Sequence, residues 1–185
     1  MANAVRAPTL TNVTARPADA PSSTHAHLIE MLDEHEADYE LLEHEPVGTT
    51  DIVSELRGNP LEQAAKCLLL MVKVDRRTRR YVLAVVPGDA KVDLGRVAAR
   101  YAARYVGFCD AVTAERLARA VPGTVLPFAM DPSVELLVDP RVLDQPRLYF
   151  NAARLDLSVS LSTTDYAAIA RPQVAEIAQR GTTAR

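Results

Sequence analysis

The distribution of apolar residues divides the chain into an unpatterned N-terminal segment and a patterned remainder. Residues 1–23 are rich in Ala, Pro, Thr and Ser and show no periodicity, so we expect a flexible leader there. From Thr24 onward apolar side chains recur at helical spacing, which predicts a first helix capped by Thr24. The remainder, residues 24–185, has the length of one domain.

Strand-like patterns follow and mix with short helices. Residues 66–74 and 81–88 are apolar runs that flank the basic segment DRRTRR, which predicts a β-hairpin. Other strands are expected within residues 38–46, 106–109, 134–139, 147–153 and 157–162. Other helices are expected over residues 49–56, 92–105 and 113–121, and from about residue 164 with an interruption at Pro172. Because strands and helices do not alternate strictly, we expect an α/β domain of the α+β type with a mixed or largely antiparallel sheet.

Capping residues mark several predicted helix ends. Gly58 is expected to end the helix over residues 49–56 in a left-handed conformation. Asn59 is expected to cap, and Pro60 to open, a short helical turn. Asp93 and Thr113 are expected to cap the two helices that follow the hairpin.

Composition and charge narrow the classes of function. Hydrophobic residues make up 48% of the chain, and 21 basic against 24 acidic residues give a net charge of −3. This charge argues against a protein-wide basic field for DNA, although a local basic patch remains open. No apolar run approaches the ~20 residues of a membrane span. The two cysteines form no CxxC pair, which fits a reducing cytoplasm, and no ligand cluster indicates a metal or cofactor.

Lys66 stands where a polar turn becomes the apolar run 66–74. Burying an ammonium costs several kcal/mol unless a partner compensates it, so this lysine is a candidate for chemistry. The simpler interpretation is a strand-end lysine that extends its amino group to water.

The loop PGTVLPF, residues 122–128, is a second candidate. Gly permits unusual dihedral angles and Pro stiffens the exit, so the loop could expose backbone N–H groups to a carbonyl or an oxyanion. An ordinary helix-to-strand connection is the alternative. The substrate-binding candidates in this loop, beside Gly123, are Thr124, Val125, Leu126, Pro127 and Phe128.

Polar side chains elsewhere offer further candidates. Asn151, Arg154 and Asp156 are polar residues beside a predicted strand end and could orient a ribose or an amine, or could form only a surface ion pair. His44 could act as a donor or base near neutral pH, although lone histidines are more often structural.

The predicted hairpin loop carries four arginines that could contact RNA phosphates or could simply be solvated. They are Arg76, Arg77, Arg79 and Arg80.

Taken together and in this order, the segments LRGNPLEQAAKCLLL, YVLAVVPGDAKVDL, PGTVLPF, LLVDP and YFNAARLD resemble the YbaK/prolyl-tRNA synthetase-associated domain family. The similarity covers roughly residues 25–172. It implies a single compact domain in which helices surround a mixed, barrel-like sheet. It also implies a freestanding, trans-editing aminoacyl-tRNA deacylase with no cofactor, which hydrolyses the ester of a mischarged tRNA, above all tRNA-Pro carrying a small wrong amino acid.

The resemblance also assigns roles to the candidates. Lys66 matches the family's key lysine, Gly123 to Pro127 its Gly-x-x-x-Pro loop, Asp156 its strand-end aspartate and His44 a histidine of its HxP-like segment. The implied partners are the acceptor end of aminoacyl-tRNA and prolyl-tRNA synthetase. A non-catalytic module that binds aminoacyl-tRNA or a synthetase, and a sensor of a small amino acid, remain alternatives.

Overall fold

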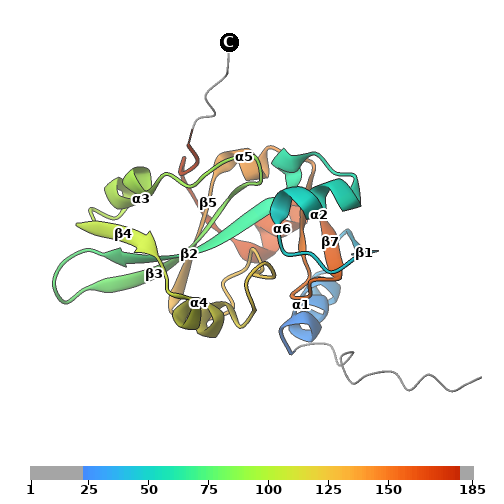
Figure 1. Cartoon of the computed structure of the whole chain (residues 1–185), viewed down its shortest axis with the longest axis horizontal. Helices are drawn as coiled ribbons and strands as arrows, with labels where there is room; N and C mark the ends of the chain where they lie inside the picture. The colour runs from blue at the N-terminus through green and yellow to red at the C-terminus, as the bar shows by residue number, and fades with distance from the viewer. Residues whose placement is uncertain (1–22, 180–185) are drawn as a thin grey trace, which may run out of the picture.

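The computed structural model describes residues 23–179. The centre of the molecule is the hairpin of β2 (Ala65–Lys73) and β3 (Arg79–Pro87). β4 (Tyr105–Phe108) pairs antiparallel with β2, whereas β5 (Val134–Val138) runs parallel to both β3 and β8 (Gln173–Val174). The order β4-β2-β3-β5-β8 makes a mixed five-stranded sheet (Figure 1). The predicted hairpin and the predicted mixed sheet are confirmed.

A second sheet lies beside the first. It is antiparallel, in the order β1 (Tyr39–Glu43), β7 (Leu157–Ser162) and β6 (Arg147–Asn151). An isolated parallel bridge between Ala64 and Tyr149 is the link between the sheets. Because this bridge replaces a continuous ladder, the described strands do not close into a barrel, which corrects the barrel-like expectation.

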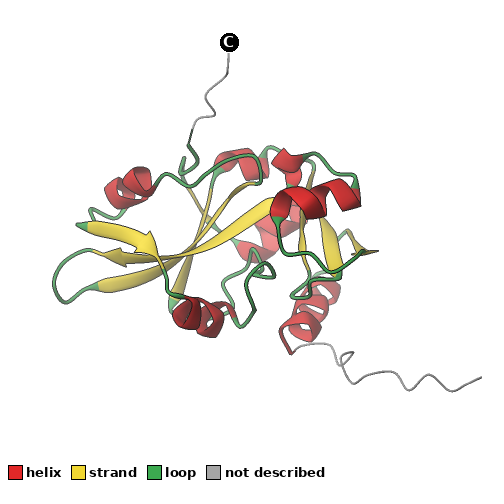
Figure 2. Ribbon diagram, in the orientation of Figure 1, coloured by secondary structure: helices red, strands yellow, loops and turns green. Residues whose placement is uncertain are grey.

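Helices surround both sheets (Figure 2). They are α1 (Ser23–Glu34), α2 (Thr50–Arg57), α3 (Leu94–Arg100), α4 (Ala111–Ala118), α5 (Pro140–Leu143) and α6 (Thr163–Ala170), with a 3₁₀ turn at Leu61–Gln63. One apolar cluster includes Leu69, Leu148 and Tyr166, and a second includes Leu70 and Ile177. The alternation of Leu69 and Leu70 between the two clusters explains why β2 is an almost continuous apolar run.

Several predicted caps are wrong, although the helices themselves form. α1 begins at Ser23, and the hydroxyl of Thr24 donates to the carbonyl of Arg119 (2.6 Å) instead of capping. Asp110 caps α4, and its carboxylate accepts from the backbone N–H of Thr113 (2.9 Å). Asp110 therefore occupies the capping position that the sequence assigned to Thr113.

The predicted cap at Gly58 is confirmed, whereas the predicted cap at Asn59 is wrong. Gly58 ends α2 with a φ of 71°, which confirms its predicted left-handed cap. Pro60 itself precedes the 3₁₀ turn, and Asn59 donates to the Pro60 carbonyl, so Asn59 is not the cap. α3 has the predicted cap, Asp93, but ends at Arg100, earlier than predicted.

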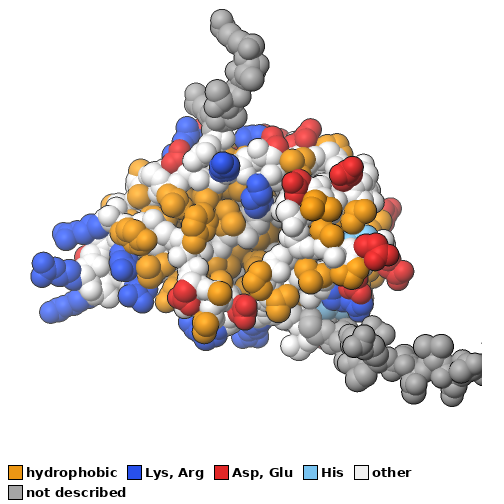
Figure 3. All heavy atoms as spheres, viewed as in Figure 1, with side chains coloured by type: hydrophobic (Ala, Val, Ile, Leu, Met, Phe, Trp, Pro, Cys, Tyr) orange, Lys and Arg blue, Asp and Glu red, His pale blue; other side chains and the backbone are white. Residues whose placement is uncertain are grey.

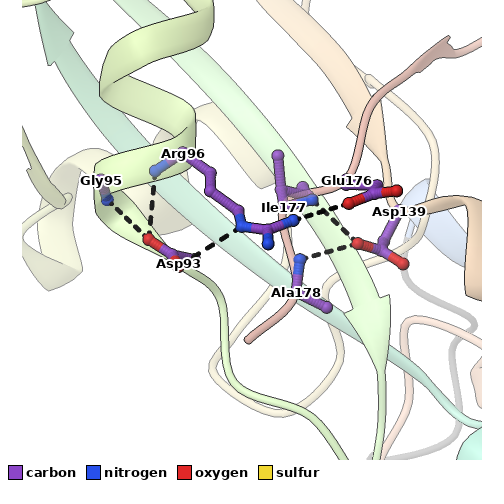
Figure 4. Close-up of polar contacts among 7 residues, drawn as sticks. All are labelled: Asp93, Gly95, Arg96, Asp139, Glu176, Ile177 and Ala178. Atoms are coloured by element: carbon purple, nitrogen blue, oxygen red, sulfur yellow. Dashed lines mark hydrogen bonds and ion pairs between the residues drawn. The ribbon is translucent and has the colours of Figure 1, made fainter. Parts of the chain in front are cut away.

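The C-terminal segment is extended where a helix was predicted. α6 ends at Ala170, and the chain continues through β8 to a segment that Asp139 holds (Figure 4). The Asp139 side chain is buried, and its carboxylate accepts from the backbone N–H groups of Ile177 (2.8 Å) and Ala178 (2.7 Å). This carboxylate anchors the segment that covers the second apolar cluster.

Asp139→Ala is expected to lower the free energy of unfolding by about 3 kcal/mol, because each hydrogen bond to a charged group contributes ~1.5–3 kcal/mol. Urea unfolding measures the change. Glu176→Ala is the matched control, because it breaks only the partly exposed ion pair with Arg96 (2.8 Å) on the same segment and should cost less than about 1 kcal/mol. Equal losses in the two variants would contradict the anchoring role of Asp139.

Candidate active site

A cavity of about 200 Å³ lies where the two sheets meet. Its lining includes Ala64 and Tyr149, the two residues of the bridge between the sheets. The polar or backbone-exposing residues around it are Gly48, Thr50, Arg57, Lys66, Gly123 and Asn151. The fold thus collects residues from four separate segments of the chain around one small space.

Lys66 lies at the rim of this cavity, near the start of β2. Its Nζ donates to the carbonyls of Gly88 (2.6 Å) and Ala90 (2.8 Å). Burial lowers the pKa of Lys66, and the nearby carboxylates of Asp89 and Asp51 oppose that shift. Because an ammonium has three N–H groups, one remains for a ligand.

Gly123 is packed against Gly48 across the cavity wall. It has a φ of 84°, and a Cβ at Gly123 would lie 2.6 Å from the Cα of Gly48. The amide nitrogen of Asn151 donates to the carbonyls of Val47 (2.9 Å) and Gly123 (3.0 Å). Asn151 therefore fastens together the two loops that carry the glycines.

His44 belongs to a hydrogen-bond network behind Asn151. Its Nδ1 lies 2.8 Å from the Glu45 carbonyl and its Nε2 lies 2.7 Å from Ser158 Oγ. The Ser158 hydroxyl donates to Asn151 Oδ1 (3.0 Å) and is also an acceptor for Arg57 (3.1 Å). The Glu45 carbonyl can only accept, so Nδ1 is the donor in that contact, and His44 itself does not line the cavity.

This network contains a Ser–His pair that the sequence did not reveal. Ser158 is fully buried, and its one proton is used by Asn151. The pair therefore lacks the exposed, deprotonatable hydroxyl that a serine nucleophile needs. Its effect is to hold Asn151 in place.

The loop after Gly123 divides between the cavity and the core. Val125 lines the cavity, whereas Thr124, Leu126 and Phe128 are buried away from it. The Thr124 hydroxyl donates to the Val121 carbonyl (2.9 Å). Pro127 also lies in the interior, where its carbonyl accepts from the Tyr166 hydroxyl (2.8 Å), so only the first part of the loop can touch a ligand in the cavity.

Asp156 and Arg154 form a bidentate ion pair outside the cavity lining, with N–O distances of 2.9 and 2.8 Å. The Arg154 guanidinium holds the pKa of Asp156 below its usual value. The Asp156 carbonyl accepts from the backbone N–H of His44 (3.1 Å), which ties this pair to the loop before α2.

The four arginines of the hairpin lie at the opposite end of β2 from Lys66 (Figure 1). Arg76, Arg77 and Arg79 are exposed. Arg80 is also exposed, but it forms an ion pair with Glu135 (2.9 Å).

Arg57 and Tyr149 are the main cavity residues that the sequence did not single out. The Arg57 guanidinium lies 5.8 Å from the centroid of the Tyr149 ring. Burial lowers the pKa of Arg57 to about 10, so it stays a cation at neutral pH. An arginine in the last turn of a helix and a tyrosine in a strand are common features, and neither signals a site.

Cys67 also lines the cavity, but its chemistry is that of a neutral thiol. Burial raises the pKa of the Cys67 thiol, which suppresses the nucleophilic thiolate. Residues 23–179 contain no cluster of three or more His, Cys, Asp or Glu side chains that could hold a metal ion. None of the helices in this range is long and apolar enough to cross a membrane.

Comparison with known proteins identifies the family. The model of the aminoacyl-tRNA editing domain family matches residues 44–169. The chain is 35% identical over 154 residues to the multifunctional Ser/Thr-tRNA deacylase ProXp-y of Escherichia coli, covering 83% of this chain and 92% of the relative. These matches define the class as aminoacyl-tRNA deacylases, which are hydrolases of ester bonds.

The chain belongs to the aminoacyl-tRNA editing domain family, as its motifs predict. Solved structures share the fold. A crystal structure described as a candidate trans-editing enzyme for prolyl tRNA synthetase matches with a TM-score of 0.72 and 15% identity, covering 87% of this chain and 100% of that one. The crystal structure of the hypothetical protein APE2540 matches with a TM-score of 0.74 and 20% identity, covering 82% and 99%.

Proposed function

We propose that this chain hydrolyses, in trans, the ester between a small wrong amino acid and the terminal adenosine of a tRNA. The observation that carries the proposal is the cavity of about 200 Å³ with Lys66 at its rim. It is smaller than the ~300–1,000 Å³ of pockets for drug-sized ligands, which suits a small side chain. The ProXp-y relative is named for Ser/Thr-tRNA, so serine and threonine are the first amino acids to test.

The tRNA and the setting follow from the sequence resemblance. We propose tRNA-Pro as one tRNA substrate, with prolyl-tRNA synthetase as a partner and the cytoplasm as the compartment. Seryl and threonyl esters on their own tRNAs are the competing substrates, given the name of the relative.

Catalysis in this proposal rests on positioning and electrostatics. Lys66 would hold the ribose or phosphate of the terminal nucleotide with its remaining N–H. Gly123 and Val125 line the cavity, and their backbone N–H groups donate no hydrogen bond within residues 23–179, so these groups are the proposed donors to the oxyanion that forms on the ester carbonyl. In this proposal Lys66 positions the terminal nucleotide, and the Gly123 loop stabilises the oxyanion on the ester carbonyl.

Water would add to the ester carbonyl carbon, while the neighbouring ribose hydroxyl takes up the water proton and passes its own proton to the esterified ribose oxygen. The bond from the carbonyl carbon to that oxygen breaks, and the oxygen leaves as a hydroxyl. The products are the free amino acid and the uncharged tRNA. The neutral thiol of Cys67 and the buried hydroxyl of Ser158 argue against a covalent enzyme intermediate.

The alternatives are a binding module and an amino-acid sensor. A module would be favoured by a cavity plugged by Phe128 or Met130. Phe128 instead packs in the core against Phe150 and Tyr166, with ring centroids 6.1 and 5.3 Å away, and Met130 does not line the cavity. The open cavity therefore favours the enzyme.

A deacylation panel tests the function. Alanine, cysteine, serine, threonine and proline are each charged on tRNA-Pro, and serine and threonine also on their own tRNAs. We expect rates above the spontaneous background for the small amino acids and background rates for prolyl-tRNA-Pro. Background rates on every substrate, combined with saturable binding of charged tRNA, would favour the binding module.

A further inference from the structure

A second polar surface lies at the far end of β2 from the cavity. It surrounds a hollow of about 520 Å³ between the β2–β3 turn and the turn that precedes β4. We call it the distal basic surface and define it by Lys73, Arg76, Arg77, Arg79, Arg104 and Tyr105. Figure 3 shows basic side chains gathered at the end of the molecule where Figure 1 places this turn.

The local fold fixes the shape of this surface. Asp75 Oδ1 accepts from the backbone N–H groups of Arg77 (2.7 Å) and Thr78 (2.8 Å), which closes the β2–β3 turn. The backbone N–H of Arg104 donates to the Lys73 carbonyl (2.9 Å), which joins the second turn to the end of β2. The two basic turns are therefore held side by side by backbone hydrogen bonds.

The charge of this surface is concentrated and largely uncompensated. Five basic side chains meet one acid, Asp75, in a chain whose net charge is −3. Arg76, Arg77, Arg79 and Arg104 belong to no ion pair among residues 23–179. Arg80, next in sequence, is instead neutralised by Glu135. Unpaired arginines on an acidic protein are suited to bind a polyanion.

Tyr105 adds an aromatic platform to the charge. Its side chain is 53% exposed, and its ring lies over Gly107, where a Cβ would collide with the Tyr105 hydroxyl. Lys73 Nζ lies 5.4 Å from the centroid of this ring. Aromatic faces combined with basic side chains are typical of nucleic-acid surfaces, where they contact bases and the sugar–phosphate backbone.

The position of the surface indicates which part of an RNA would reach it. Lys73 lies seven positions after Lys66 in β2, which corresponds to about 23 Å at ~3.3 Å per residue. At ~3.4 Å per stacked nucleotide, this is about seven nucleotides from the ester. We propose that the distal basic surface docks the sugar–phosphate backbone of the tRNA acceptor stem while the aminoacyl end occupies the cavity. The proposal rests on the proposed function.

The test compares two triple variants that change the net charge equally. The first replaces Arg76, Arg77 and Arg79 by alanine. The control replaces Arg80, Arg96 and Arg171, each of which bonds to another residue of the fold. Each protein is assayed on an aminoacylated acceptor-stem minihelix and on an aminoacylated trinucleotide that represents only the unpaired 3′ end.

With the minihelix, the first variant is expected to show a KM raised about five- to tenfold. The slope of log binding constant against log salt should flatten by about 2–3, which corresponds to three lost phosphate contacts. The control variant should behave as the wild type, and all proteins should hydrolyse the trinucleotide ester equally.

The outcomes separate this proposal from the proposed function. If wild type hydrolyses both substrates and the first variant matches the control on the minihelix, the docking proposal is overturned. The same holds if the first variant loses only binding to vesicles of anionic and neutral phospholipid, which would make the surface a membrane contact. If wild type hydrolyses neither ester, the proposed function itself fails, and docking is then judged from minihelix binding alone.

Discussion

Lys66→Ala is expected to lower kcat/KM for aminoacyl-tRNA hydrolysis by about 10²–10³, because the terminal nucleotide, and with it the ester, loses the group proposed to position it. The lysine is fixed at the cavity rim by its bonds to the carbonyls of Gly88 and Ala90. A side chain held in this way loses little further freedom when a substrate binds. The measurement is single-turnover deacylation, corrected for spontaneous hydrolysis of the ester.

The same variant leaves two buried carbonyls without their donor. Unsatisfied buried groups cost about 1–3 kcal/mol, so the protein should be less stable but folded. Lys91→Ala is the matched control, because Lys91 is an exposed lysine directly after Ala90. If folded Lys66→Ala hydrolyses the ester within twofold of wild type, the lysine serves only to hold the turn at residues 88–90.

The pH profile gives an independent measurement of the charge on Lys66. Because burial lowers the pKa of Lys66, its ammonium loses its proton at lower pH than that of an exposed lysine. If activity needs the cation, the corrected rate should fall on the alkaline side before an ordinary lysine would titrate. Lys66→Arg should move this fall to higher pH, because arginine stays protonated.

The parts of the fold that the sequence predicts well are those with strong local signals. The apolar runs at residues 66–74 and 81–88 predict the hairpin because both faces of these strands are buried. Gly58 marks the end of α2 because a left-handed residue favours glycine.

Other parts depend on contacts that no local pattern contains. β8 has only two residues, and the chain after it is held by Asp139, some 40 positions earlier. Asp110 and Thr113 are both good caps, and only the path of the chain decides between them. The barrel-like expectation fails for a similar reason, since closure requires pairing between strands that the sequence does not specify.

The candidate site also combines residues that the sequence indicates with residues that only the fold brings together. Lys66 and Gly123 come from distant segments, and the family resemblance, not their spacing, groups them. Asn151 is a candidate only because it is a polar residue beside a predicted strand end. The structure adds the reason for Asn151, which bonds to both cavity loops. The sequence gives no signal for Arg57 or the buried Ser158, because their roles depend on the residues that the fold places around them, Tyr149 beside Arg57 and His44 and Asn151 beside Ser158.

Gly123→Ala is expected to lower kcat/KM by about 10²-fold, the cost of displacing a positioning group by ~1 Å. A Cβ at this position would lie 2.6 Å from the Cα and 2.9 Å from the carbonyl oxygen of Gly48. Both are backbone atoms and cannot rotate away, so the two loops must separate. Their separation would strain the bonds from Asn151 to the carbonyls of Val47 and Gly123 and move the N–H groups proposed to hold the oxyanion.

Gly58→Ala is the control that distinguishes the clash with Gly48 from the strain of a left-handed backbone conformation. Gly58 also has a positive φ, 71° against 84° for Gly123, but a Cβ there would meet nothing within 4 Å. Both variants should lose about 1–3 kcal/mol of stability from the left-handed dihedral angle. Only Gly123→Ala should also lose activity and change the ratio of rates for two aminoacyl esters that differ by one methylene, because only its cavity wall moves. If the two variants agree in activity and in this ratio, the loop at residues 122–128 is a connection that takes no part in substrate selection.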